Sequence, residues 1–334
     1  MYFKKYLLAL ATLQFLLAAA LYGQETTEYE NLKVLSPDTT REELGMAMLQ
    51  NLQGLGLPRR QREGCLYCHV GSMDQPVGEW DFASDDKATK AKARVMMQMV
   101  KDINTSHLAS LDGRIDDDFQ VTCYTCHAGR TDPRPLAIVI RETWATEGIG
   151  AATGKYRELR ERYFGAGAYD FRPAILSGLA NGVAGAGAWD DALVLATLNE
   201  SANPESLAAS RARFALQLNR QIEERDVSQA LQYFVRERAN ERPGVVDLSV
   251  LDGLGWGIYR QERIEEALQI FRSNVDLYPD EYIPNESLGD ALWFSDDLAG
   301  GIAVFEIWVA AHPENDMGRR RLLNMQEEIR LNRE

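Results

Sequence analysis

The hydrophobic positions of this chain follow a helical period almost throughout, apart from one continuous apolar run near the N-terminus. Lys4 and Lys5 precede that run, which extends from Tyr6 to Tyr22 and ends at small and polar residues. A short apolar run behind a basic start is typical of a secretory signal peptide and is short for a permanent membrane span. We therefore expect residues 1–23 to be a cleaved signal, with an uncleaved membrane anchor as the alternative. The mature protein is then expected to be soluble, in the periplasm or outside the cell.

Two stretches in the first half carry strong helical patterns. The first starts at Thr40 and Glu43, which have the spacing of a capping box, and the second starts after Ser84. In both stretches the apolar residues recur three to four positions apart, which predicts one apolar face on each helix. The residues of the two faces are Leu44, Met48, Leu52 and Leu55 in the first helix and Ala93, Met96, Val100, Ile103 and His107 in the second.

The second half contains an internal repeat with a period of 34 residues, which is the tetratricopeptide period. Looser copies surround Leu179-Ala180 and Ala230-Leu231, so about four helix-turn-helix units are expected over residues 154–334. Units of this kind stack into a solenoid that exposes a binding surface. The matching positions of the two clearest copies are Leu254-Gly255 with Leu288-Gly289, Phe271 with Phe305, and Pro279 with Pro313.

All four cysteines of the chain lie in two copies of the motif Cys-x-x-Cys-His, which are Cys65 to His69 and Cys123 to His127. This motif attaches haem covalently: the two thiols form thioethers with one porphyrin, and the adjoining imidazole reaches the iron. The sequence therefore predicts two covalently bound haems c. The attachment residues are Cys65, Cys68, Cys123 and Cys126.

Other uses of paired cysteines fit this sequence less well. A zinc site made from both pairs does not require a histidine directly after each second cysteine, yet two of the four histidines stand there. A thioredoxin-like dithiol calls for a strand before it and a helix after it, and the flanking residues predict no such unit. A pair of disulfides is a further alternative.

The first haem has His69 as its predicted proximal ligand, and periodicity selects Met48 as the sixth ligand. Met46 lies about 200° around the same helix and faces elsewhere. A methionine on a helical face is by itself more often a core residue than a ligand. The ligand interpretation gains weight because a methionine-bearing helix precedes each cysteine motif.

The second haem has His127 as its predicted proximal ligand and Met96 as the preferred sixth ligand. Met99 lies beside Met96 on the helix and is the next choice, whereas Met97 points elsewhere. His107 is a further alternative, and a histidine ligand lowers the potential of a haem relative to methionine. The remaining histidine, His312, precedes a proline in a repeat loop and is expected at the surface.

The formal net charge of −14 changes the range of expected partners. An acidic chain is not suited to nucleic acid. The charge is compatible with a basic redox partner protein, although an acidic solvated surface is the commoner explanation.

Together these patterns predict an all-α protein with an N-terminal di-haem cytochrome c domain followed by a tetratricopeptide-like solenoid. The cysteine motifs end at the break from Arg130 to Pro135. The expected parts are a signal peptide over 1–23, the cytochrome domain over 24–135, a linker or helix over 136–153 and the repeat domain over 154–334.

Residues 31–135 resemble the cytochrome c subunit of photosynthetic reaction centres and its two-haem relatives. The resemblance is carried by Asn31 to Leu35, Asp81 to Lys87, Lys92 to Met97 and Val121 to His127. It implies that each haem is held by a helix with the axial methionine, a turn, and a second helix that begins with the haem motif. On this pattern Met48 and Met96 fall at the axial positions. The second half is similar to bacterial tetratricopeptide segments, as in Lys155 to Leu159 and Tyr169 to Phe171.

The chain also departs from that family. The phototrophic subunit has four haem motifs and this chain has two, so docking onto a reaction centre does not follow. Ser110 stands where that subunit has a histidine that ligates a further haem. Relative to that family, two segments resemble insertions between the ligand helix and the haem motif: Arg59 to Glu63 and Leu108 to Phe119.

From these features we predict an exported electron-transfer protein, not an enzyme, whose iron centres exchange single electrons and whose repeats associate with a protein partner. One rival hypothesis is a homo-oligomer or filament, assembled through the repeats, that relays electrons between subunits. Another is a di-haem peroxidase, which needs an iron with an open sixth position. The methionine-rich helices before both motifs argue against the peroxidase.

Overall fold

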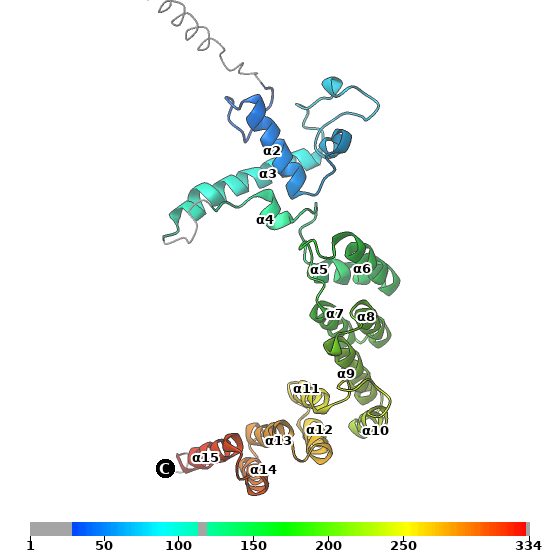
Figure 1. Cartoon of the computed structure of the whole chain (residues 1–334), viewed down its shortest axis with the longest axis vertical. Helices are drawn as coiled ribbons and strands as arrows, with labels where there is room; N and C mark the ends of the chain where they lie inside the picture. The colour runs from blue at the N-terminus through cyan, green and yellow to red at the C-terminus, as the bar shows by residue number, and fades with distance from the viewer. Residues whose placement is uncertain (1–28, 113–118, 332–334) are drawn as a thin grey trace, which may run out of the picture. The chain divides into compact units, whose positions relative to one another are not determined.

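The computed structural model describes residues 29–112 and 119–331, whose secondary structure is helical (Figure 1). The one β feature within these ranges is an isolated antiparallel bridge between Val70 and Asp81. The all-α prediction is therefore confirmed. The predicted signal peptide, residues 1–23, lies outside the described residues. No helix of the described ranges has both the length and the apolar composition needed to cross a membrane.

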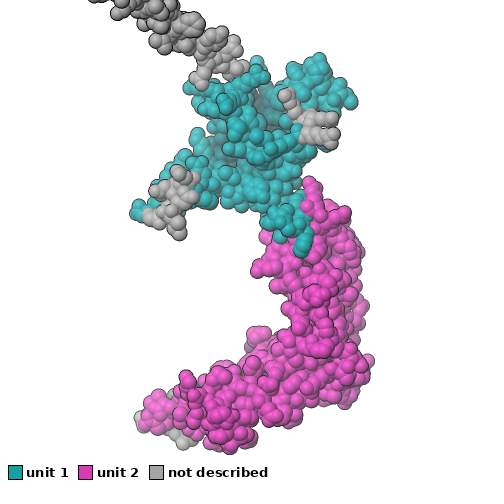
Figure 2. All heavy atoms as spheres, in the orientation of Figure 1, with its two compact units in different colours: residues 1–134, 163–169 teal, residues 135–162, 170–334 magenta. Residues whose placement is uncertain are grey.

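Internal contacts divide the chain into two compact units, which Figure 2 distinguishes by colour. The first unit comprises the described part of residues 1–134 together with Tyr163–Tyr169. The second unit comprises Pro135–Arg162 and the described residues from Asp170 onward. Residues 136–153 form a helix and the start of the next one, and they group with the second unit.

Two long helices dominate the first unit, α2 (Arg41–Gly54) and α3 (Ala88–Asp102). The capping box at the start of α2 is present: the Thr40 N–H donates to Glu43 Oε2 at 2.8 Å, and the Glu43 N–H donates to Thr40 Oγ1 at 3.3 Å. After α3 the chain forms a wider π turn over Ile103–His107, which changes the helical register between Met96 and His107. The shorter segments are η1 (Arg60–Tyr67), η2 (Val77–Glu79), η3 (Ile103–His107), η4 (Leu108–Ser110) and α4 (Cys123–His127).

Consecutive helices of the second unit pack in pairs, with α7 against α8, α11 against α12, and α13 against α14. The pairs repeat along this unit as a solenoid, and α15 packs on α14 at its C-terminal end. The helices are α5 (Leu136–Glu147), α6 (Ile149–Tyr163), α7 (Pro173–Gly185), α8 (Trp189–Ala202), α9 (Leu207–Glu224), α10 (Val227–Glu237), α11 (Leu248–Tyr259), α12 (Ile264–Leu277), α13 (Tyr282–Phe294), α14 (Leu298–Ala311) and α15 (Asp316–Leu331).

The turns inside three of the helix pairs have the same backbone conformation. Gly187, Glu262 and Asp296 have φ values of 82°, 63° and 65°, in the left-handed region. The residue after each has φ between −87° and −89° and ψ between 63° and 67°. The α9–α10 turn differs, because Arg225 there has φ −136° and ψ −95°. The pair α7–α8 is therefore a regular repeat unit, and α9–α10 is the divergent one.

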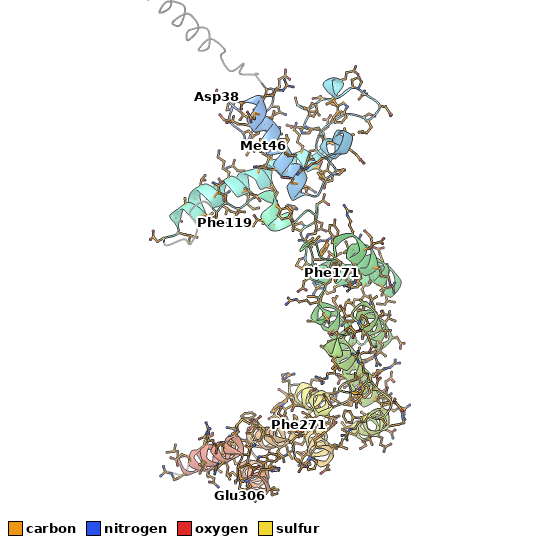
Figure 3. All side chains as sticks on the ribbon, in the orientation of Figure 1. Asp38, Met46, Phe119, Phe171, Phe271 and Glu306 are labelled. Atoms are coloured by element: carbon orange, nitrogen blue, oxygen red, sulfur yellow. The ribbon has the colours of Figure 1, made fainter. Side chains whose placement is uncertain are left out.

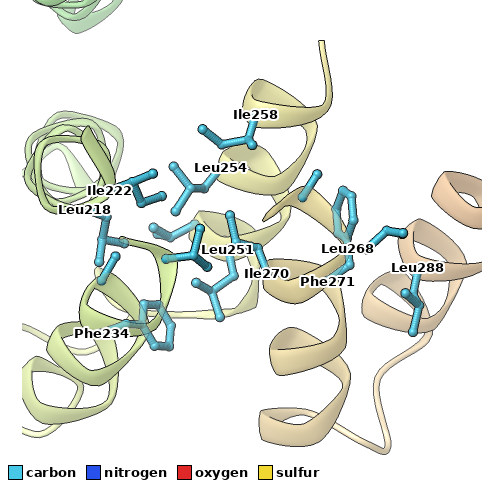
Figure 4. Close-up of a cluster of buried hydrophobic side chains, with 14 of the residues drawn as sticks. Leu218, Ile222, Phe234, Leu251, Leu254, Ile258, Leu268, Ile270, Phe271 and Leu288 are labelled. Carbon is cyan, nitrogen blue, oxygen red and sulfur yellow. The ribbon is translucent and has the colours of Figure 1, made fainter. Parts of the chain in front are cut away.

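The glycine and phenylalanine that recur every 34 residues form the crossing point of each pair. A Cβ atom at Gly255 would lie 2.6 Å from a ring carbon of Phe271, and one at Gly289 would lie 2.5 Å from a ring carbon of Phe305. The absence of a side chain thus lets a buried aromatic ring of the second helix lie against the first. Phe271 joins a continuous hydrophobic core with residues such as Leu254 and Leu288 (Figure 4).

Candidate functional site

The second cysteine motif forms the short helix α4 between two well-defined ends. At its start the Thr122 N–H donates to Thr125 Oγ1 at 3.0 Å. At its end Ala128 and Gly129 have φ values of 47° and 77°, which reverse the chain. Left-handed residues commonly end a helix in this way. The motif is therefore a single helical turn, in which the two cysteines lie three residues apart.

Glycines at the end of α2 allow a close approach to this second motif. A Cβ atom at Gly54 would lie 2.5 Å from Cβ of Cys123, and one at Gly56 would lie 2.0 Å from the carbonyl oxygen of Gly129. The Gly129 N–H donates to the Gly54 carbonyl at 3.0 Å. Any side chain at either position would force the two segments apart.

Asn51 links this site to α3. Its Oδ1 accepts a hydrogen bond from Cys123 Sγ at 3.3 Å, and its Nδ2 donates to Met97 Sδ at 3.6 Å. Asn51 is not among the site residues predicted from the sequence. The available signal was a polar residue next to the apolar face that contains Met48 and Leu52.

The first cysteine motif is held by the N-terminal turn of α3. Lys87 donates to the carbonyl of Leu66, and the hydroxyl of Thr89 donates to the carbonyl of Tyr67. The start of α3 thus packs on the first motif, whereas the end of α2 packs on the second. Sequence order alone therefore does not decide which helix faces which motif.

Both motif histidines are oriented in the same way by a backbone carbonyl. His69 Nδ1 lies 3.2 Å from the carbonyl oxygen of Phe82, and His127 Nδ1 lies 2.8 Å from that of Arg130. A carbonyl only accepts hydrogen bonds, so Nδ1 must carry the proton in each ring. In this tautomer Nε2 carries a free lone pair, through which the imidazole can bind a metal.

Local electrostatics favour ligand chemistry over thiol redox chemistry. Burial raises the pKa of Cys68 and of Cys123, opposite to the lowered pKa of a reactive dithiol. Burial, with the nearby charge of Lys90, lowers the pKa of His69, which favours the neutral imidazole. Within residues 29–112 and 119–331, no group of three or more His, Cys, Asp or Glu side chains is placed to hold a metal ion. The cysteine pairs therefore do not converge into one zinc site.

The methionines proposed from sequence differ in their surroundings. Met48 is half-buried, and Met46, labelled in Figure 3, is 52% exposed on α2. On α3, Met96 and Met99 are 43% and 42% exposed, whereas Met97 is half-buried against Asn51. Met96 and Met99 thus share an open side of α3.

A cluster of charges around Asp85 ties the N-terminal segment to α3. The Asp85 carboxylate accepts hydrogen bonds from Lys33 at 2.6 Å and from Asn31 at 2.9 Å, and it pairs with Arg94 and Lys90 at 2.5 Å and 3.6 Å. The hydrogen bond from Lys33, followed by that from Arg94, holds the pKa of Asp85 well below its usual range. The cluster holds three cations beside one carboxylate, next to the first motif.

The first unit lacks a hydrophobic core of its own. Within the described part of residues 29–134, Trp80 is the one hydrophobic side chain that is buried. Large apolar side chains of this unit instead remain exposed. Two porphyrins would supply the apolar core that these side chains lack. The exposed set comprises Met46, Tyr67, Met73, Phe82, Val95, Met96, Met99, Leu111, Phe119 and Tyr124.

These are the features of a c-type cytochrome domain followed by a helical repeat domain. Residues 17–175 match the family model described as photosynthetic reaction centre cytochrome C subunit, which confirms the resemblance seen in residues 31–135. Similar curated proteins are reaction centre cytochrome c subunits. That of Roseobacter denitrificans is 33% identical over 118 residues, covering 34% of this chain and 28% of the relative. That of Thermochromatium tepidum is 40% identical over 73 residues, covering 22% of this chain and 15% of the relative. The chain thus spans only a minor part of the length of these relatives.

Two solved structures are similar to part of this chain. MamA from Desulfovibrio magneticus RS-1 is 16% identical, with a TM-score of 0.26, covering 54% of this chain and 95% of MamA. A thermophilic tetratricopeptide repeat protein from Thermus thermophilus is 15% identical, with a TM-score of 0.27, covering 57% of this chain and 97% of that protein.

Proposed function

We propose that this protein is an exported electron carrier with two covalently attached haems c and a repeat domain that binds a protein partner. The observation that carries the proposal is the first unit itself. It has two Cys-x-x-Cys-His motifs, two histidines in the ligating tautomer and almost no core of its own. A unit that buries so few of its own apolar side chains requires an additional apolar body to be stable.

The attachment residues follow from the motif. Cys65 and Cys68 would hold one haem and Cys123 and Cys126 the other, each through thioethers that prevent haem loss outside the cell. When bound, each haem iron supplies one-electron chemistry. The chain contributes the covalent anchors, the histidine orientation and the exclusion of water from the porphyrin faces.

His69 and His127 would be the proximal ligands, with Met48 and Met96 as the sixth ligands of the first and second haem. The half-buried position of Met48 and the open side of α3 at Met96 support these choices. Met99 is the next candidate for the second haem because it shares that open side. Two coordinating methionines leave no open iron position, which supports a carrier over a peroxidase.

The domain organisation and location belong to the same proposal. The cytochrome domain would occupy 24–135 and the repeat domain 154–334, joined by 136–153, after removal of the signal over 1–23. Covalent haem attachment and a basic start followed by an apolar run both support export. The helix pairs of the second unit support a role in binding a redox partner protein, because stacked pairs expose a continuous surface.

The test is to express the full chain in a host that matures c-type cytochromes, then count haems and titrate them. We expect two covalent haems per chain, low-spin spectra and two reversible one-electron transitions. The matched variants Cys65→Ala/Cys68→Ala and Cys123→Ala/Cys126→Ala should each retain one covalent haem. A protein without covalent haem, or with a resting high-spin haem that reacts with peroxide, contradicts the proposal.

A further inference from the structure

One backbone carbonyl serves two donors beside the first motif. The carbonyl oxygen of Phe82 lies 3.2 Å from His69 Nδ1 and 2.8 Å from Lys90 Nζ. Since the imidazole and the ammonium group both donate to this oxygen, each weakens it as an acceptor for the other. The charged donor makes the stronger bond, because charge-assisted hydrogen bonds exceed neutral ones.

Lys90 occupies a fixed and unusual position. Its side chain is 9% exposed, and besides Phe82 its ammonium donates to the carbonyls of Ala83 at 2.9 Å and Ser84 at 2.6 Å. Asp85 Oδ1 lies 3.6 Å away. A lysine is rarely buried to this extent, and three carbonyls offset the loss of water.

The buried charge of Lys90 is only partly balanced by the acids nearby. Asp85 is shared with Lys33 and Arg94. Asp81 is the other carboxylate close enough to influence Lys90 electrostatically. Lys90, Arg94 and Lys87 all act on His69 as positive charges. The first motif therefore lies in a positive local field.

The second motif is built differently. His127 Nδ1 lies 2.8 Å from the carbonyl of Arg130, a shorter distance than the one at His69. The buried guanidinium of Arg130 is directed at two other carbonyls, those of His127 and Arg134. The second histidine thus keeps a strong hydrogen bond, whereas the first competes with an ammonium group.

We propose that Lys90 is a positioning residue that raises the reduction potential of the first haem. A strong hydrogen bond from the far ring nitrogen makes an axial imidazole a better electron donor and stabilises ferric iron. Lys90 weakens that bond by sharing the Phe82 carbonyl. Its positive charge also disfavours the extra charge of the ferric state. Both effects favour the ferrous state. This inference rests on the proposed haem attachment.

The test compares Lys90→Met, Lys90→Arg and Lys92→Met in the full-length holoprotein by spectroelectrochemical titration. Lys90→Met should lower one of the two midpoints, with about a tenfold shift toward ferric haem at fixed ambient potential, equivalent to about 59 mV. Lys90→Arg keeps the positive charge, so its midpoint should stay closer to the wild-type value than that of Lys90→Met. Lys92 is an exposed lysine two residues along α3, and Lys92→Met should move neither midpoint.

A second measurement reports on the hydrogen bond itself. With four histidines in the chain, ¹⁵N-histidine labelling resolves the His69 ring N–H in the ferrous protein. Its proton resonance should move downfield in Lys90→Met, because the bond to Phe82 strengthens. Two haems per chain with unmoved midpoints, or an equal shift of both midpoints, would overturn the role of Lys90. Absence of two covalent haems in the wild-type protein would instead overturn the proposed function.

Discussion

Gly54 ends helix α2 directly against Cys123, so that a Cβ atom on Gly54 would lie 2.5 Å from Cβ of Cys123. The same position would be 3.0 Å from the carbonyl carbon of Cys123 and from the nitrogen of Tyr124. Backbone atoms cannot move aside as easily as the end of a flexible side chain. A residue far from the motif in sequence thereby determines how closely α2 packs on it.

Gly54→Ala should therefore separate α2 from the second motif and destabilise the first unit by about 1–3 kcal/mol. Gly45→Ala is the matched control on the same helix, because no atom lies within 4 Å of the added Cβ. That control should be stabilising by about 0.5–1 kcal/mol through helix propensity. Urea unfolding of the holoprotein measures both changes. Equal effects at the two glycines would show that the Gly54 contact is unimportant.

Methionine substitutions test the axial ligands. Met48→Ala and Met96→Ala should each open one iron position, change the spin state of one haem and shift its potential. Met46→Ala should leave both haems unchanged, since its side chain faces away from Met48. Absorption and electron paramagnetic resonance spectra of the ferric proteins report the outcome. If Met99→Ala changes the second haem and Met96→Ala does not, the ligand is Met99.

Asp85 should make the stability of the first unit depend on pH. Its pKa in the folded state is lowered from 3.8 by the Lys33 and Arg94 hydrogen bonds. The unfolded chain therefore takes up the proton first, so the stabilisation is present above about pH 4 and lost as pH falls through the folded pKa. Asp85→Asn should lower the free energy of unfolding more at pH 7 than at about pH 2.5, because the stabilisation declines gradually below about pH 4. Urea unfolding at both pH values checks this.

The control for that experiment is Asp86→Asn, because Asp86 is the next residue and is exposed. It should show little change at either pH. An Asp85→Asn effect of the same size at neutral and at acidic pH would mean that the charge of the carboxylate is not what stabilises the cluster.

Alanine substitutions at two glycines of α11 should differ in their effect on stability, because the two glycines differ in their contacts. Gly255→Ala would press a Cβ against the Phe271 ring at 2.6 Å and should cost about 1–3 kcal/mol. Gly257→Ala, on the same helix with no atom within 4 Å, should be neutral or stabilising by about 0.5–1 kcal/mol. Far-UV circular dichroism during urea unfolding measures the difference. A neutral Gly255→Ala would show that the ring moves aside without cost.

The state of the protein in solution tests the role of the repeats. A carrier that recruits a different protein should give a concentration-independent mass of a monomer or small closed oligomer in light scattering. Particles that grow with concentration would favour the filament hypothesis, because repeated contacts that do not close form open assemblies.

Some of this protein could be read directly from local sequence. The capping box at Thr40 and Glu43 depends on neighbouring residues and was found as expected. The 34-residue spacing marked Gly255 and Phe271 as repeat positions, and the structure shows that they lie against each other. The all-α class followed from the same helical period. The cysteine motif predicts its own chemistry because three of the ligating groups lie within five residues.

The contacts between segments distant in sequence were determined by the tertiary structure, because no sequence spacing encodes them. Asn51 meets Cys123, Gly54 meets the second motif, and Lys90 shares the Phe82 carbonyl with His69, across separations that carry no periodic signal. The chain reversal at Ala128 and the π turn before His107 also depend on how the segments pack. The sequence by itself determined the helices, the repeats and the haem motifs, because these rest on local periodicity and covalent chemistry. Only the fold decided which polar groups reach each histidine, because hydrogen bonds and buried charges act over a few ångströms between segments distant in sequence.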